Sequence, residues 1–128
     1  MEKSRFIKEK IEFIYINEKK RILNIAFNIN NAYSMQAGVV ITSAIINSKD
    51  VGFTFHIFMD SVDDKNLSLF DQLAEKFCVN IYIYIVNMDS FRGFGAEKTR
   101  FTAVSLFRLC MTDVLRKITD RFLYLDAD

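Results

Sequence analysis

Two carboxylates, one residue apart, are the side chains of this sequence best suited to metal chemistry. Asp126 and Asp128 follow the apolar run 122–125, which has the composition of a short strand. Side chains two residues apart point the same way along an extended segment, so both carboxylates can reach one point beyond the strand end. Hard oxygen ligands of this kind suit Mg²⁺ or Mn²⁺, especially where phosphates complete the coordination shell. The alternative from the pattern alone is a strand that runs into an acidic surface turn.

A phosphate-bearing ligand would need such a metal, or basic side chains, because the sequence has no glycine cradle. Neither the P-loop pattern GxxxxGK[ST] nor the dinucleotide-binding pattern GxGxxG is present. Lys98, Arg100 and Arg108 are the basic candidates. Arg108 also has a simpler interpretation, since Ser105, Arg108 and Thr112 have the spacing of a solvent-facing helical stripe. Periodicity alone leaves both interpretations of Arg108 open.

Two other groups of polar residues favour structural roles. His56 lies inside the apolar run 53–58, where we expect a hydrogen-bonded structural histidine and not a catalytic one. Asp60, Asp63 and Asp64 precede a helical pattern. Acidic residues at a helix N-terminus cap it and interact favourably with its dipole. Helix capping therefore explains this loop better than a second metal site.

The composition fits one globular domain with a substantial core. The 128 residues are 51% hydrophobic and carry a net charge of +1, which argues against a disordered chain and against general nucleic-acid binding. Cys78 and Cys110 lie in apolar helical patterns, so we expect buried free thiols and a reducing compartment. No segment approaches the ~18 apolar residues of a membrane span, and the N-terminus lacks the apolar core of a signal peptide.

The N-terminal segment differs from the rest in charge. Residues 1–21 contain seven Lys or Arg and four Glu, which gives a local net charge of +3. We expect a solvated, partly frayed leader over residues 1–22. A weak attraction to the anionic surface of the inner membrane is the alternative role of this charge.

From residue 23 onward, strand-like and helix-like segments alternate. The strand candidates are 23–27, 53–58, 81–86 and 122–125, and the helical patterns are 37–45, 67–77 and 102–116. This alternation predicts a Rossmann-like α/β fold, with a parallel sheet, right-handed crossovers and flanking helices. Ligands of such sheets bind at the carboxyl ends of the strands. The polar loop 28–33 and the Asp126/Asp128 pair should both open there.

Several segments together resemble the motifs of one known family. Residues 23–33 look like its opening strand and nucleotide loop, and residues 36–45 look like its first helix. Phe107-Arg108 and the run 122–128 look like its donor helix and its DxD metal motif, and 55–60 reads like its second strand. The family that these segments resemble, over residues 23–128, is glycosyltransferase family 8, and in particular the bacterial lipopolysaccharide core glucosyl- and galactosyltransferases.

The resemblance implies a nucleotide-diphospho-sugar transferase fold of the GT-A type. It also implies a divalent cation, Mn²⁺ or Mg²⁺, and a UDP-hexose donor such as UDP-glucose or UDP-galactose. The hexose would be transferred to a lipopolysaccharide core acceptor with retention of anomeric configuration. The location implied is cytoplasmic, with peripheral association to the inner membrane as a further option.

Each site residue takes its role from its place in the family motifs. By resemblance, Asp126 and Asp128 hold the metal against the diphosphate, and Ala127 offers a backbone contact near the ribose. Tyr33 could stack on the uracil ring, and Asn30 stands where relatives usually carry Asp. The full set of expected donor-binding residues is Asn28, Asn30, Ala32, Tyr33, Thr102, Arg108 and Ala127.

Family members are substantially longer than this chain. We therefore expect residues 23–128 to be the donor-binding N-terminal part of an incomplete glycosyltransferase domain, without the acceptor site and without useful activity alone. The run 122–125 should form a sheet edge, and an apolar edge strand invites oligomers. The alternatives are an inert remnant of a disrupted gene, a haloacid-dehalogenase-like phosphotransferase, in which an Asp-x-Asp motif follows a strand, and a receiver-like signalling domain.

Overall fold

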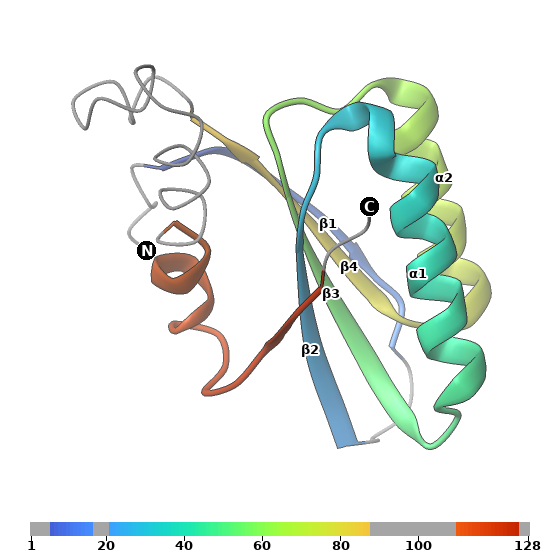
Figure 1. Ribbon diagram of the computed structural model, residues 1–128. Coiled ribbons are helices and arrows are strands. Elements are labelled where there is room, and N and C mark those ends of the chain that lie inside the picture. The colour runs from blue at the N-terminus through green and yellow to red at the C-terminus, as the bar shows by residue number, and fades with distance from the viewer. Residues whose placement is uncertain (1–5, 17–20, 88–109, 126–128) are drawn as a thin grey trace.

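Five strands form one sheet in the computed structural model, which describes residues 6–16, 21–87 and 110–125 (Figure 1). The strand order across the sheet is β1-β4-β3-β2-β5. The strands are β1 (Ile7–Ile14), β2 (Arg21–Asn28), β3 (Val51–Met59), β4 (Asn80–Val86) and β5 (Leu123–Tyr124). The helices are α1 (Ser34–Asn47) and α2 (Asp64–Phe77), a short 3-10 helix η1 (Asn31–Tyr33) precedes α1, and residues 110–115 are also helical.

The predicted parallel sheet is present in its central part. β2, β3 and β4 run parallel to one another, with α1 between β2 and β3 and α2 between β3 and β4 in the chain. β5 pairs with the other side of β2, also parallel. Every residue of β3 after Val51 is buried, as expected for a central parallel strand covered on both faces. The order β1-β4-β3-β2-β5 also confirms that the run 122–125 forms a strand at the edge of the described sheet.

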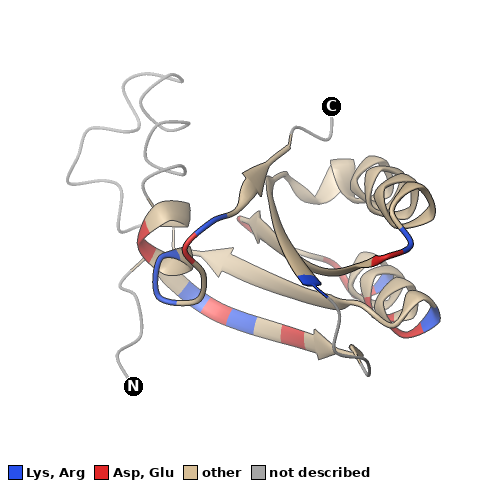
Figure 2. Ribbon diagram, turned by 90° about the horizontal axis from the view of Figure 1, so that it is seen from below, with Lys and Arg blue, Asp and Glu red and all other residues tan. Residues whose placement is uncertain are grey.

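The N-terminal segment corrects two expectations. Residues 7–14 are not a solvated leader: they form β1, which pairs antiparallel with β4, so the sheet is mixed and not wholly parallel. Along β1, Ile11 and Phe13 pack against the main core, while Lys10 and Glu12 alternate with them. This alternation of apolar and charged residues is typical of an edge strand with one covered face, but it is not obvious in a segment with so many charged residues. Figure 2 shows these charges on β1, whereas its neighbour β4 and the next strand, β3, carry none.

The end of β1 is anchored by side-chain contacts. The side-chain oxygen of Asn80 accepts hydrogen bonds from the backbone N–H groups of Tyr15 and Ile16, at 3.0 and 3.1 Å. The hydroxyl of Tyr15 donates to Asp71 in α2 at 2.6 Å. These contacts join the end of β1 to both β4 and α2, which is inconsistent with a frayed leader.

Two hydrophobic clusters lie on opposite faces of the sheet. α1 and α2 cover one face, and helical residues 110–115 lie over the other (Figure 1). The larger cluster lies under α1 and α2 and includes Phe27, Phe55, Ile57 and Phe70. The smaller one joins Phe58, Tyr84 and Ala26 to Cys110, Met111 and Leu115. The central strands are thus covered on both sides, and their carboxyl ends are left to carry ligand-binding loops.

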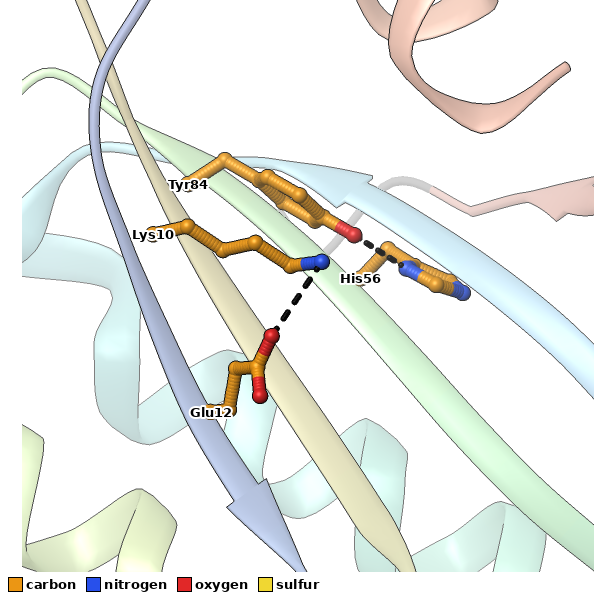
Figure 3. A network of polar contacts seen from close by, with 4 residues as sticks. All are labelled: Lys10, Glu12, His56 and Tyr84. Atoms are coloured by element: carbon orange, nitrogen blue, oxygen red, sulfur yellow. Dashed lines mark hydrogen bonds and ion pairs between the residues drawn. The ribbon is translucent and has the colours of Figure 1, made fainter. Parts of the chain in front are cut away.

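His56 is the structural histidine that its apolar surroundings predicted. Its side chain is fully buried on the face that carries the smaller cluster. Nδ1 lies 2.9 Å from the Tyr84 hydroxyl, and Nε2 lies 2.9 Å from the side-chain oxygen of Asn24. Lys10 extends over the Tyr84 ring and pairs with Glu12 at 3.3 Å (Figure 3). Burial, and secondarily the charge of Lys10, lowers the pKa of His56 to about 4.

The expectation of two buried cysteines holds for only one of them. Cys110 is buried in the smaller cluster. Cys78 is exposed, because α2 ends at Phe77 and Cys78 takes the left-handed conformation, φ 54°, that terminates the helix. Its backbone N–H caps the carbonyls of Ala74 and Glu75. The helical pattern 67–77 ends where α2 ends, so Cys78 lies just beyond the helix and not within its apolar face.

Candidate functional site

The candidate site lies where β2, β3 and β5 reach their carboxyl ends on the same edge of the sheet. Asn28 is the last residue of β2, and the next residue, Ile29, donates its N–H to the carbonyl of Phe58 in β3 at 3.0 Å. On the other side, the N–H of Leu125 donates to the carbonyl of Ala26 at 3.0 Å. The loop after β2 and the end of β5 therefore lie at the same edge of the sheet, as the strand pattern predicted.

The loop after β2 presents three of its four predicted donor-binding residues to solvent. Asn28 is half-buried, whereas Asn30, Ala32 and Tyr33 are exposed. Asn30 is extended, with φ −93° and ψ 170°, and its carbonyl accepts the N–H of Tyr33 at 3.1 Å. Tyr33 as a whole residue is 39% exposed, and an exposed tyrosine can stack against a planar ligand.

The neighbouring loop after β3 holds this loop in place. Asp63 is the N-cap of α2, as the capping interpretation predicted, and its carboxylate accepts from the Asn66 N–H at 2.7 Å. Its other oxygen accepts from the Asn31 side chain at 2.8 Å. The Asn31 hydrogen bond, followed by that of the Asn66 N–H, lowers the pKa of Asp63 below its ordinary value. The charged carboxylate is therefore the form present at neutral pH.

Sequence reasoning missed Asn31 and Asn66. The available signal was the N-cap Asp63, whose second carboxylate oxygen needs a partner once the first is used for capping. Nothing in the sequence indicated that the partner lies 32 positions away, in the loop after β2. The pairing depends on the parallel neighbours β2 and β3, which end side by side.

Five of the predicted site residues lie outside the described residues. They are Thr102, Arg108, Asp126, Ala127 and Asp128. Their roles in donor and metal binding stay predictions. Within residues 6–16, 21–87 and 110–125, no group of three His, Cys, Asp or Glu side chains is arranged to hold a metal. The same residues contain no helix long and apolar enough to cross a membrane.

Two hollows in the described residues lie away from the carboxyl ends of β2, β3 and β5. One, of about 590 Å³, runs between α1 and α2 and is lined mainly by apolar side chains such as Met35, Val39 and Leu73. The other, of about 500 Å³, lies at the amino end of β2, beside Arg21 and Arg121. Neither is lined by a predicted donor-binding residue, so the site assignment rests on strand ends and loop chemistry.

Comparison with known proteins gives matches over most of the chain. Residues 24–128 match the sequence profile of Glycosyl transferase family 8. A lipopolysaccharide 1,3-galactosyltransferase of Salmonella typhimurium is 30% identical over 105 residues, which are 82% of this chain and 31% of that protein. A lipopolysaccharide 1,2-glucosyltransferase of Escherichia coli is 31% identical over 106 residues, 83% of this chain and 31% of that protein.

A third relative covers nearly the whole chain. A lipopolysaccharide glucosyltransferase of Escherichia coli is 28% identical over 128 residues, 99% of this chain and 38% of that protein. The chain thus spans about a third of the length of these curated relatives. No solved structure gives a significant match.

Proposed function

Because the chain belongs to glycosyl transferase family 8, we propose that it carries the donor-binding part of a lipopolysaccharide core hexosyltransferase. The mixed sheet with flanking helices fits the GT-A nucleotide-sugar transferase fold. The donor in this proposal is UDP-glucose or UDP-galactose, transferred with retention. The observation that supports the proposal is that β2 and β5 run parallel side by side, so that the loop after β2 and the end of β5 lie at the same edge of the sheet, inside the segment that matches the family.

The nucleoside would bind to the exposed residues of the loop after β2. Tyr33 offers a ring face for uracil, and the Asn30 side-chain carbonyl can accept from the uracil N3–H. Ala32, between them, leaves room because its side chain is a single methyl group. Asn28, half-buried at the strand end, would form the floor of this pocket.

The diphosphate would be held by a divalent cation and by basic or hydroxyl side chains. Asp126 and Asp128 offer hard oxygen ligands that suit Mn²⁺ or Mg²⁺. A cation held by these carboxylates would supply positive charge to balance the negative charge that develops on UDP as it departs. In this proposal Ala127 contacts the ribose through its backbone, and Thr102 and Arg108 contact the donor sugar or its phosphates.

The acceptor in this proposal is the lipopolysaccharide core, a substrate class taken from the names of the relatives. The location in this proposal is cytoplasmic, with peripheral attachment to the inner membrane as a further option. The chain matches about a third of each relative. Within such an enzyme, we propose that these residues bind the donor.

Titration calorimetry of UDP, with and without Mn²⁺, tests the donor site. The wild-type chain should bind UDP in a metal-dependent manner, and the double variant Asp126→Ala/Asp128→Ala should lose that dependence. Asp120→Ala is the matched control, because Asp120 is an exposed carboxylate that precedes β5 instead of following it. Absence of UDP binding to folded wild-type protein would contradict the proposal and favour an inert remnant. The family match already disfavours the haloacid-dehalogenase-like and receiver-like alternatives.

A further inference from the structure

We infer that Asn31, Asp63 and Asn66 form a clamp that positions the loop after β2 for the nucleoside of the donor. The inference rests on the proposed function, since it assigns positioning residues to that same site. The three residues come from the loop after β2, the loop after β3 and the first turn of α2. None of them needs to touch the ligand, because their role is to hold the residues that do.

The central contact is a two-way pair between Asn31 and Asp63. The Asn31 side-chain NH₂ donates to the second carboxylate oxygen of Asp63 at 2.8 Å. In return, the backbone N–H of Asp63 donates to the Asn31 side-chain oxygen at 3.0 Å. The first carboxylate oxygen of Asp63 remains with the Asn66 N–H, so helix capping and loop binding use different oxygens of one side chain.

Asn66 completes the clamp from the helix side. Its side-chain NH₂ donates to the backbone carbonyl of Asn31 at 3.1 Å and to the Asn31 side-chain oxygen at 3.0 Å. The same Asn31 carbonyl also accepts from the Ser34 hydroxyl at 2.9 Å. The side-chain amide of Asn31 is therefore turned toward α2 and engaged at both its oxygen and its nitrogen.

The hydrogen bonds of Asn31 to Asp63 and Asn66 hold the loop while its neighbours stay accessible to a ligand. Asn30, Ala32 and Tyr33 are exposed on a loop whose conformation is set by Asn31. A loop that is ordered before the ligand arrives does not lose that conformational freedom on binding. The clamp should therefore raise nucleoside affinity without any contact to the nucleoside.

A charge-preserving swap tests the clamp directly. In Asp63→Asn, the side-chain oxygen can still cap α2, but its NH₂ group faces the NH₂ of Asn31. In Asn31→Asp, two carboxylate oxygens face each other. In the double variant, Asp at position 31 accepts from Asn at position 63, so the pair is restored with its donor direction reversed. Asp64→Asn, which removes the adjacent first-turn carboxylate, is the matched control.

Two readouts are needed, both at a temperature where every variant is folded. The first is binding of uridine, followed by NMR titration, because uridine carries no phosphate that the moved charge would repel. The second is hydrogen exchange of the Asp63 and Tyr33 backbone amides, which donate to Asn31 and Asn30. Each single variant should weaken uridine binding roughly fivefold to tenfold and speed exchange of both amides. The swapped double variant should return to within about twofold of the wild type.

The outcomes separate this inference from the proposed function. Unchanged exchange in both single variants would overturn the clamp. Faster exchange with unchanged uridine affinity would show that the clamp holds the loop but does not serve the nucleoside, which also overturns the inference. A wild-type chain with protected loop amides that binds neither uridine nor UDP would instead overturn the proposed function, and with it the nucleoside role of the clamp.

Discussion

His56 and Tyr84 share a buried hydrogen bond of 2.9 Å between the neighbouring strands β3 and β4. The other ring nitrogen of His56 faces the side-chain oxygen of Asn24, which can only accept, so Nε2 carries the proton. Nδ1 then accepts from the Tyr84 hydroxyl. Both nitrogens are satisfied by the neutral ring, and a second proton on Nδ1 would require the Tyr84 hydroxyl to change from donor to acceptor.

The stability of the protein should consequently fall as the pH falls below about 6.5. Burial lowers the pKa of His56 in the folded protein to about 4. Between about pH 6.5 and pH 4, the unfolded chain therefore binds a proton that the folded chain does not. The expected loss approaches about 1.4 kcal/mol per pH unit toward the acid end of the window. Urea unfolding measured between about pH 7 and pH 5 checks it.

His56→Gln isolates this effect, since Gln can hydrogen-bond but does not titrate. The variant will be less stable at neutral pH, yet its stability should change less over the same pH range. The contribution of the carboxylates to the pH dependence is the same in both proteins and cancels when the two slopes are compared. Equal slopes for the two proteins would show that His56 does not control the acid sensitivity.

Cys78→Gly should stabilise the protein by about 1 kcal/mol. Cys78 has φ 54° at the end of α2. This left-handed conformation is energetically unfavourable for a residue with a Cβ and is readily adopted by glycine. Thermal or urea unfolding measures the gain. Cys78→Ala is the control because it removes the sulfur and keeps the Cβ, so a gain of the same size in both variants would point to the sulfur instead.

The two thiols should differ strongly in reactivity. Burial, with a smaller contribution from Asp113, raises the pKa of Cys110 to about 12, and the side chain has no exposed surface. Cys78 is exposed. Iodoacetamide should therefore modify Cys78 in the native protein, and Cys110 only after unfolding, as peptide mass spectrometry would show. Equal labelling in the native state would mean that helical residues 110–115 open readily.

Asn80→Ala should destabilise the protein by about 1–2 kcal/mol, because two backbone N–H groups lose their acceptor. Those groups belong to Tyr15 and Ile16, at the end of β1. Asn80→Asp keeps an acceptor oxygen and should retain most of the stability. If the N-terminal segment were a frayed leader, neither substitution would change the exchange rate of the Tyr15 amide.

Association through the β5 edge is a further expectation. β5 is last in the strand order, and Leu123 on it is 49% exposed. A charged residue on an edge strand discourages pairing with a second copy. Leu123→Lys should therefore reduce concentration-dependent association measured by light scattering. A wild-type chain that stays monomeric at high concentration would contradict the expectation.

Much of the fold could be predicted from local pattern. Helical spacing identified α1 and α2, and apolar runs identified β2, β3 and β4, because hydrophobic periodicity is a property of neighbouring residues. β1 was missed because its Lys and Glu side chains dominate the composition of residues 1–21. Only alternation at Ile11 and Phe13 marked it as a strand, and a half-covered edge strand gives a weak signal.

The sequence by itself determined the order of elements from β2 onward and the residue types at the candidate site, since both depend on contiguous segments such as 23–33 and 122–128. Tertiary structure alone decided which distant side chains meet. Asn31 and Asp63 pair across 32 positions only because β2 and β3 end side by side. Asn80 anchors the end of β1 only because β1 pairs antiparallel with β4. Hydrogen-bond partners are set by the spatial neighbours of a residue, and those neighbours depend on strand order, which local periodicity does not encode.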